Sequence, residues 1–310
     1  MQNDMILRVT SSPHVRRNRT TQSIMLDVII ALMPAGIFGV AHFGWRAALV
    51  IAVCAFSAVA WEFIYNHMAH KKQTFADLSA VVTGLLLAYN LPAAVPLWMC
   101  VIGTGLAIML VKMIFGGIGC NFVNPALAAR AILMTSWVDH MSGGAFMLDA
   151  VTKATPLVEE YSYMQLFLGT VPGCIGEVSK LAILLGLSYM LIRGVVSWHI
   201  PVIMAGTTFV LSWIASGSIA GGMDSALYQL LSGGLILGAC FMANDYTTSP
   251  VTVTGKCIYA AGCGLIVFVI RKLSPMSEGV SYAILFMNLV VPLIDRFVRP
   301  RVYGRSGKNA

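Results

Sequence analysis

The sequence predicts an all-α protein that crosses a membrane about ten times, as two inverted five-helix repeats with broken or short helices at the centre. Three observations support this fold. Of the 310 residues, 58% are apolar and only 11% are charged; apolar segments recur along the whole chain; and two of these segments match each other at a fixed spacing. A soluble globular domain carries about 25% charged residues. The low charge therefore excludes an ordinary cytosolic enzyme, a disordered chain and most nucleic-acid binders.

Ten apolar segments are candidate membrane helices, because a helix needs about 20 apolar residues to cross roughly 30 Å of hydrocarbon. In chain order they are residues 24–43, 47–65, 75–91, 95–111, 125–138, 178–196, 200–220, 227–243, 256–270 and 279–294. The first is too long for the core of a signal peptide and has no cleavage site, so we expect it to be retained. The chain then divides into a tail (1–22), a first repeat (23–138), a connection (139–177), a second repeat (178–295) and a second tail (296–310).

The distribution of lysine and arginine predicts the orientation. With the N-terminus inside, fourteen of the 20 basic residues lie in cytoplasmic segments, five lie in outer segments, and Arg130 lies within a helix. Both tails are basic, so the number of crossings is even and both termini are cytoplasmic. We therefore expect the excess positive charge, +7 overall, to contact anionic lipid and not nucleic acid.

The cysteines do not predict a metal or disulfide site. There are seven of them and none forms a CxxC pair. Most lie in apolar segments, where they are typical small residues of membrane helices.

An internal repeat supports the inverted architecture. Residues 103–112 (GTGLAIMLVK) match residues 262–271 (GCGLIVFVIR), an offset of 159. Each repeat holds five helices, an odd number, so the second repeat is upside down relative to the first. Helix breaks after Tyr89 and Ala243 occupy matching places, and paired breaks of this kind mark the functional centre of inverted-repeat proteins. Broken backbone at membrane depth must be buried in protein or line a cavity.

The only long connection is acidic and is predicted to lie outside the cell. Its five carboxylates against Lys153 give a net charge of −4. It contains the sequence Asp149-Ala-Val-Thr152-Lys153-Ala154-Thr155-Pro156-Leu157. On spacing alone this is a turn-like segment, with Thr152 as a local cap.

This segment resembles the flavinylation motif, Asp-x-x-Thr-x-Ala-Thr-Pro-Leu, of one membrane-protein family. That family unites the D subunit of the Rnf complex with the B subunit of the sodium-pumping NADH:quinone oxidoreductase. Residues 116–125, 169–179 and 242–250 also resemble the family, in the right order, and the short N-terminal tail is closer to the Rnf branch. The resemblance implies that Thr155 carries FMN through a phosphoester bond, with Asp149, Thr152, Lys153 and Ala154 completing the motif. Lys153 is a departure, because the family more often has Gly there.

The resemblance further implies a role in a redox-driven ion pump of the cell (inner) membrane. The chain would relay electrons between partner subunits, with ferredoxin as donor, NAD⁺ as acceptor and Na⁺ or H⁺ as the coupled ion. It has no Rossmann glycine fingerprint and no cluster-binding cysteine run, so we expect partners, and not this chain, to bind ferredoxin and NAD⁺. A second flavin, riboflavin, is implied by resemblance only. The alternative is a small-solute channel or secondary transporter of inverted-repeat type, which would not need the Thr155 segment.

Two carboxylates are the candidates for an ion pathway. Charges inside a membrane are costly and mark such pathways by default. Glu62 and Asp245 lie within or beside the predicted helices and match acidic positions of the family, with structural hydrogen bonding as the alternative role. Asp295 is expected to form an interfacial pair with Arg296, and Asp27 has either a solvated or a functional role.

Three further residues are candidates for cofactor binding. Arg130 would neutralise a carboxylate or a flavin phosphate, or would bind carbonyl groups at a helix break. Gly173 and Gly176 belong to segment 169–179, whose backbone N–H groups suit an anion if the segment is not simply a tight turn. No residue of this chain is predicted to be catalytic by itself.

Overall fold

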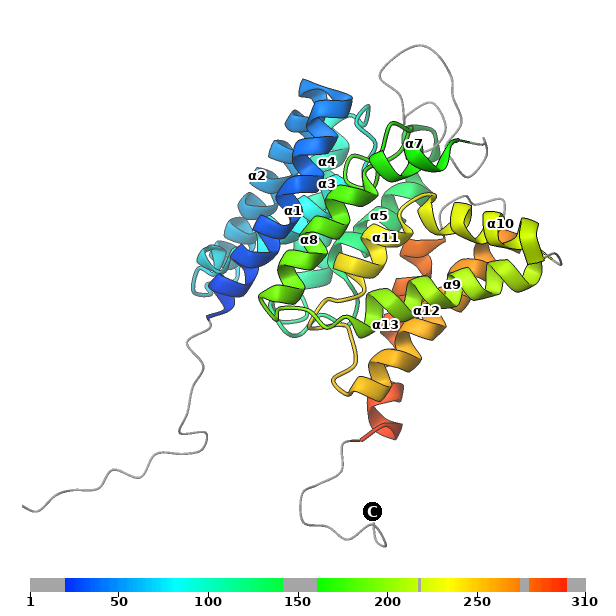
Figure 1. Ribbon diagram of the computed structural model, residues 1–310. Coiled ribbons are helices and arrows are strands. Elements are labelled where there is room, and N and C mark those ends of the chain that lie inside the picture. Colours follow the sequence, from blue (N-terminus) through cyan, green and yellow to red (C-terminus); the bar gives the residue numbers. More distant parts are fainter. Residues whose placement is uncertain (1–19, 142–160, 217–218, 274–278, 300–310) are drawn as a thin grey trace, which may run out of the picture.

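The computed structural model describes residues 20–141, 161–216, 219–273 and 279–299, and within these ranges the chain is helical without strands (Figure 1). The first half contains α1 (Thr21–Phe43), α2 (Trp45–Met68), η1 (Phe75–Asp77), α3 (Ser79–Tyr89), α4 (Leu97–Gly105), η2 (Leu106–Met113) and α5 (Pro125–Ser136). Two short helices follow, α6 (Val138–Met141) and α7 (Tyr163–Leu168). The second half contains α8 (Lys180–Ile192), α9 (His199–Ala215), α10 (Ile219–Leu231), α11 (Leu235–Leu237), η4 (Gly238–Met242), α12 (Val253–Leu273) and α13 (Val280–Phe297).

Each of the ten predicted apolar segments contains helix in its described residues, but the helices differ in length and several segments are interrupted. Four helices, α1, α2, α12 and α13, are long and apolar enough to cross a membrane. A fifth candidate consists of α10 with α11 and η4, which are bent by 65° at their junction. Shorter apolar helices cover Ser79–Tyr89, Leu97–Met113, Lys180–Ile192 and His199–Ala215. The chain is therefore a multi-pass membrane protein with several shortened helices.

Two of the predicted segments are interrupted for local backbone reasons. The segment at 75–91 divides at Leu78, whose φ of 60° places it in the left-handed region and separates η1 from α3. The segment at 227–243 divides near Gly233, which has a φ of 63° that glycine adopts without strain. Both interruptions divide a predicted segment into shorter helices.

The described helices form two groups that meet along two contacts. Helix α2 packs on α3 and α4 in the first half, and α9 packs on α12 in the second. The two groups join where α1 lies beside α8 and where α5 lies beside α13 (Figure 1). At the first contact, a Cβ added to Gly186 would lie only 2.1 Å from the Ala31 carbonyl oxygen. Small residues allow this close approach of two helices, as is usual in membrane proteins.

Two segments, η2 and η4, are wound as π-helices. Their backbone bonds reach five residues back, as in Ile114 N–H to Met109 O (3.2 Å) and Ala243 N–H to Gly238 O (2.8 Å). Such segments are uncommon and are frequent at functional sites. One ends near Lys112 and the other ends at the break after Met242.

Candidate functional site

The two helix breaks meet at the centre of the molecule. The Asn90 side chain, just past the end of α3, donates to Leu86 O (2.6 Å) and contacts Met242 Sδ (3.5 Å) at the end of η4. Asn124 donates from its side chain to Met242 O (3.2 Å), and its Oδ1 caps the first turn of α5. Side-chain amides thus donate hydrogen bonds to backbone carbonyl groups that have no helical partner at the breaks.

Arg130 on α5 is buried and lies at the same junction. Its guanidinium donates to Asn90 Oδ1 (2.6 Å) and to Cys174 Sγ (3.5 Å). These contacts join α5 to the break after α3 and to the segment before α8, through a side-chain amide and a thiol and not through the backbone carbonyls expected in one of the alternatives. A role toward a flavin phosphate stays a prediction.

The segment before α8 packs against the first break. The N–H groups of Ile175 and Gly176 donate to Leu91 O (3.1 Å) and Tyr89 O (3.0 Å). The Cys174 N–H donates to Glu177 Oε1 (3.0 Å). This turn therefore binds a carboxylate of the same segment. Three of the N–H groups that the sequence predicted to suit an anion thus already donate hydrogen bonds within the protein.

The two candidate glycines in this segment allow close packing. A Cβ on Gly176 would lie 2.3 Å from Tyr89 Cβ, and one on Gly173 would lie 3.1 Å from Glu177 Oε1. Their role toward a cofactor stays a prediction.

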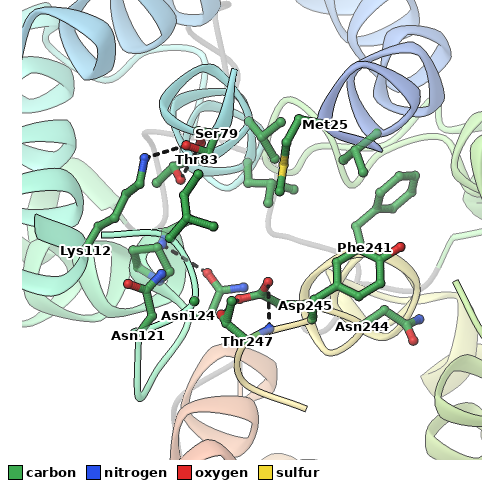
Figure 2. Close-up of a pocket in the computed structure, with 18 of the residues that line it drawn as sticks. Met25, Ser79, Thr83, Lys112, Asn121, Asn124, Phe241, Asn244, Asp245 and Thr247 are labelled. Carbon is green, nitrogen blue, oxygen red and sulfur yellow. Dashed lines mark hydrogen bonds between the residues drawn. The ribbon is translucent and has the colours of Figure 1, made fainter. Parts of the chain in front are cut away.

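An open cavity lies beside the breaks (Figure 2), and the space between atoms there, including the open solvent at its mouth, is about 780 Å³. It is enclosed by elements of both halves. Its polar lining includes Ser79, Thr83, Lys112, Asn121, Asn124, Asn244, Asp245 and Thr247, and its apolar lining includes Met25, Val28, Leu86 and Phe241. The Asn121 Oδ1 atom is buried and has no hydrogen-bond partner among the described residues. The cavity therefore offers both polar and apolar contacts at the junction of the two halves.

Asp245, one of the two ion-pathway candidates, lines this cavity from the loop after η4. Its Oδ2 accepts bonds from the hydroxyls of Thr247 (2.9 Å) and Thr248 (3.3 Å). The group is thus a partly buried carboxylate held by hydroxyl donors, and no lysine or arginine of the described ranges forms an ion pair with it.

Glu62, the other candidate, is paired with a lysine that the sequence did not single out. Its Oε2 lies 3.0 Å from Lys112 Nζ, and the two side chains are only 1% and 2% exposed. Lys112 Nζ also donates to Ser79 Oγ (2.7 Å), and the Thr74 hydroxyl donates to Glu62 Oε1. Lys112 and Ser79 line the cavity (Figure 2), whereas Glu62 is not among the residues that line it.

The remaining acidic candidates hold helices together. Asp27 on α1 accepts bonds from the Tyr189 hydroxyl (3.0 Å) and from Arg193 (3.1–3.3 Å), so it joins α1 to the end of α8. Asp295 accepts a bond from the Val251 N–H (3.3 Å). Both contacts are tertiary and span long distances in the sequence.

The motif residues Asp149, Thr152, Lys153, Ala154 and Thr155 lie outside the described residues. Within the described ranges, no three His, Cys, Asp or Glu side chains converge in a way that would hold a metal ion. The site that the structure does describe is therefore the central cavity, its breaks and the buried Glu62–Lys112 pair.

Comparison with known proteins identifies close relatives over almost the full length of the chain. Residues 8–304 match the model of the NQR2, RnfD, RnfE family. The D subunit of the Na(+)-translocating ferredoxin:NAD(+) oxidoreductase complex of Acetobacterium woodii is 47% identical, over 97% of this chain and 96% of that protein. The D subunit of the proton-translocating complex of Clostridium ljungdahlii is 40% identical, over 96% of each. The D subunit of an ion-translocating oxidoreductase complex of Halorhodospira halophila is 34% identical, over 97% of each.

Proposed function

This chain belongs to the NQR2, RnfD, RnfE family, and we propose from this that it is the flavin-carrying, ion-conducting membrane subunit of an Rnf-type ferredoxin:NAD⁺ oxidoreductase. It works as one subunit of a multi-subunit, redox-driven ion pump and is not catalytic alone. Its own tasks are to relay electrons between partner subunits and to guide the coupled cation. Ferredoxin and NAD⁺ bind to the partners. The observation that carries this proposal is the full-length match to the D subunits of such complexes.

The architecture that suits this role is an inverted repeat of two five-helix units. Three features of the described residues support it. Helix α1 packs on α8, and α5 packs on α13, so equivalent helices of the two units meet in pairs. Both units have a helix that ends at a break, after Tyr89 and after Met242, and the breaks contact each other through Asn90.

The proposed orientation has both termini in the cytoplasm and segment 139–177 outside. In Figure 1 the start of α1 and the end of α13 lie toward the same end of the molecule, while α7 lies toward the opposite end. Helix α7 follows the motif that contains Thr155, so this arrangement agrees with a flavin carried on the face opposite the termini.

Thr155 is the proposed attachment site for FMN, with Asp149, Thr152, Lys153 and Ala154 as the surrounding motif. When bound, FMN supplies a redox centre that accepts and passes on electrons. The role of the chain is to hold that centre in a small volume near the membrane surface, which raises its effective concentration for its electron partners. A phosphoester to the threonine side chain keeps the flavin at this place without relying on equilibrium binding.

If a second, non-covalent flavin is bound, the central cavity is the place that suits it. Its apolar walls from Met25, Leu86 and Phe241 fit a planar ring system, as ligand sites are mostly apolar with a few placed polar groups. The unpartnered Asn121 Oδ1 is a hydrogen-bond acceptor for a ring N–H. Asp245 on the same cavity would place a cation-binding carboxylate beside a redox centre.

The experiment is in-gel flavin fluorescence with peptide mass mapping, on the chain co-expressed with a flavin transferase. A phosphoester survives denaturation, so the wild-type band should fluoresce and the modified peptide should contain Thr155. Thr155→Ala should lose the fluorescence, whereas the matched variant Thr152→Ala, three residues away, should keep it. Fluorescence that persists in Thr155→Ala, or that is absent from the wild type, would show that the assignment is wrong.

A further inference from the structure

We infer that Glu62 and Ser79 form a binding site for a monovalent cation, that Thr74 positions the Glu62 carboxylate, and that the Lys112 ammonium occupies this site as a tethered substitute for that cation. The inference rests on the proposed function, because it names the place where the coupled ion is held within this subunit. The residues involved come from three elements: Lys112 lies on η2, Ser79 lies on α3, and Thr74 lies in the turn before η1.

The oxygen atoms around Lys112 Nζ are those that an alkali cation would take. Glu62 Oε2 lies 3.0 Å and Ser79 Oγ lies 2.7 Å from the nitrogen. The Thr74 hydroxyl bonds the other Glu62 oxygen and itself accepts from Asn66 Nδ2 (3.0 Å). Carboxylate and hydroxyl oxygens replace the hydration shell of a cation that enters a membrane protein. An ammonium has one positive charge and three N–H donors, so it binds the same oxygens.

Burial makes an uncompensated charge at this site costly. Glu62 and Lys112 are almost fully inaccessible, at 1% and 2% exposure. Removing one partner of a buried ion pair leaves the other charge uncompensated, which is strongly unfavourable. Exchange of the ammonium for a free cation avoids this, because the charge beside Glu62 stays the same throughout.

The geometry also makes Lys112 the residue that stands between Glu62 and the central cavity. Lys112 and Ser79 line the cavity, and Figure 2 shows the ammonium bonded to Ser79 at the cavity edge. A cation that moves from the cavity past Ser79 to Glu62 would take the position of the ammonium. The lysine side chain is long and flexible, so it can withdraw into the cavity, where Asp245 provides a second carboxylate.

The matching residue of the other repeat differs in a way that supports an exchangeable role for Lys112. Arg271, 159 positions later, donates to Gln229 O (2.5 Å) and Ser232 O (3.0 Å), which are backbone carbonyls at the end of α10. A planar guanidinium fixed on two carbonyls is suited to clamping a helix end. Lys112 instead presents a single compact charge, on a flexible side chain, to a carboxylate.

The test is equilibrium binding of ²²Na⁺ to the purified, assembled complex, without turnover. Apparent affinity falls in proportion to the fraction of molecules in which the site is free, so an ammonium that fills the site in about nine molecules of ten weakens binding about tenfold. Lys112→Met should therefore bind ²²Na⁺ at least about tenfold more tightly than wild type. Adding Glu62→Gln to this variant should abolish the gain. Lys256→Met is the matched control, because Lys256 also bonds a serine (Ser197, 3.4 Å) but does not line the cavity.

An affinity for ²²Na⁺ in Lys112→Met that stays within twofold of wild type would overturn the inference, as would a gain that survives Glu62→Gln. If Lys112→Met does not assemble, Lys112→Gln decides by the same criteria, since an amide keeps hydrogen bonds to Glu62 and Ser79 without the charge. Failure of the proposed function is seen separately, as wild-type complex that oxidises ferredoxin without moving any cation across a vesicle membrane.

Discussion

The contact between α1 and α8 predicts that Gly186 does not tolerate even a methyl group. A Cβ at this position would lie 2.1 Å from Ala31 O and 2.9 Å from Phe241 Cζ. A carbon rarely approaches a carbonyl oxygen closer than about 3.3 Å. The oxygen belongs to the backbone of α1 and cannot rotate away, so Gly186→Ala must push the two helices apart by roughly 1 Å.

The expected cost follows from two opposing effects. Overpacking of a well-packed interior costs about 1–3 kcal/mol. Replacing glycine by alanine within a helix returns up to about 1 kcal/mol. We therefore expect a net destabilisation of up to about 2 kcal/mol relative to wild type. An unfolding entropy of about 2.1 cal/mol/K per residue then lowers the melting temperature of 310 residues by up to about 3 °C.

The measurement is thermal unfolding in detergent with a dye that fluoresces on reaction with thiols. Five cysteines are buried in the folded chain and become reactive on unfolding: Cys54, Cys100, Cys174, Cys240 and Cys263. Gly206→Ala on α9 is the matched control, since a Cβ there would have no other atom within 4 Å. It should melt at or slightly above the wild-type temperature. A Gly186→Ala variant that melts no lower than Gly206→Ala would refute the close packing of α1 on α8.

Two further predictions concern the ion pathway and the orientation. Asp245→Asn should slow ion-dependent ferredoxin oxidation about tenfold or more, as expected for loss of a charged contact of roughly 1.5–3 kcal/mol, and should leave covalent flavin in place. Asp224→Asn, an exposed carboxylate on α10, should turn over at the wild-type rate; equal rates in both variants would remove Asp245 from the pathway. A cysteine introduced at Ser142 should react with an impermeant reagent added outside, and a reporter fused after Ala310 should report the cytoplasm; a C-terminal reporter on the outer face would exclude the ten-span orientation.

Much of the helical content can be predicted from the sequence because it depends on local properties. Apolar composition over about 20 residues marks a segment that is stable in lipid. Asn90-Leu-Pro92 also predicts where α3 ends, since proline disfavours helix in the residue before it. The left-handed backbone at Leu78 has no comparable signal, because leucine seldom adopts that conformation. The division between η1 and α3 therefore emerges only from the structure.

The pairing of charged residues is predicted less well, because it depends on how distant helices pack. The sequence alone makes Lys112 a flanking charge at the cytoplasmic end of its helix, yet it is buried against Glu62, fifty residues earlier. The sequence does not decide the role of Asp27, whose partner Arg193 lies 166 residues away. The match between Lys112 and Arg271 in the internal repeat is the one signal in the sequence that draws attention to both residues.

The π-helical winding of η2 determines which way the charge at position 112 faces. A π turn contains more residues than an α turn, so each residue of η2 turns the chain by less than the 100° of an α-helix, and Lys112, near the end of η2, lags behind α-helical phase. Plain α-helical winding from Leu106 onward would turn the lysine to a different side of the helix from the one that contacts Glu62 and Ser79. A relative that retained the lysine but lost one residue from this segment would keep the residue type and lose the ion pair. Helical phase, in addition to residue identity, is thus a criterion for judging which members of the family share this buried pair.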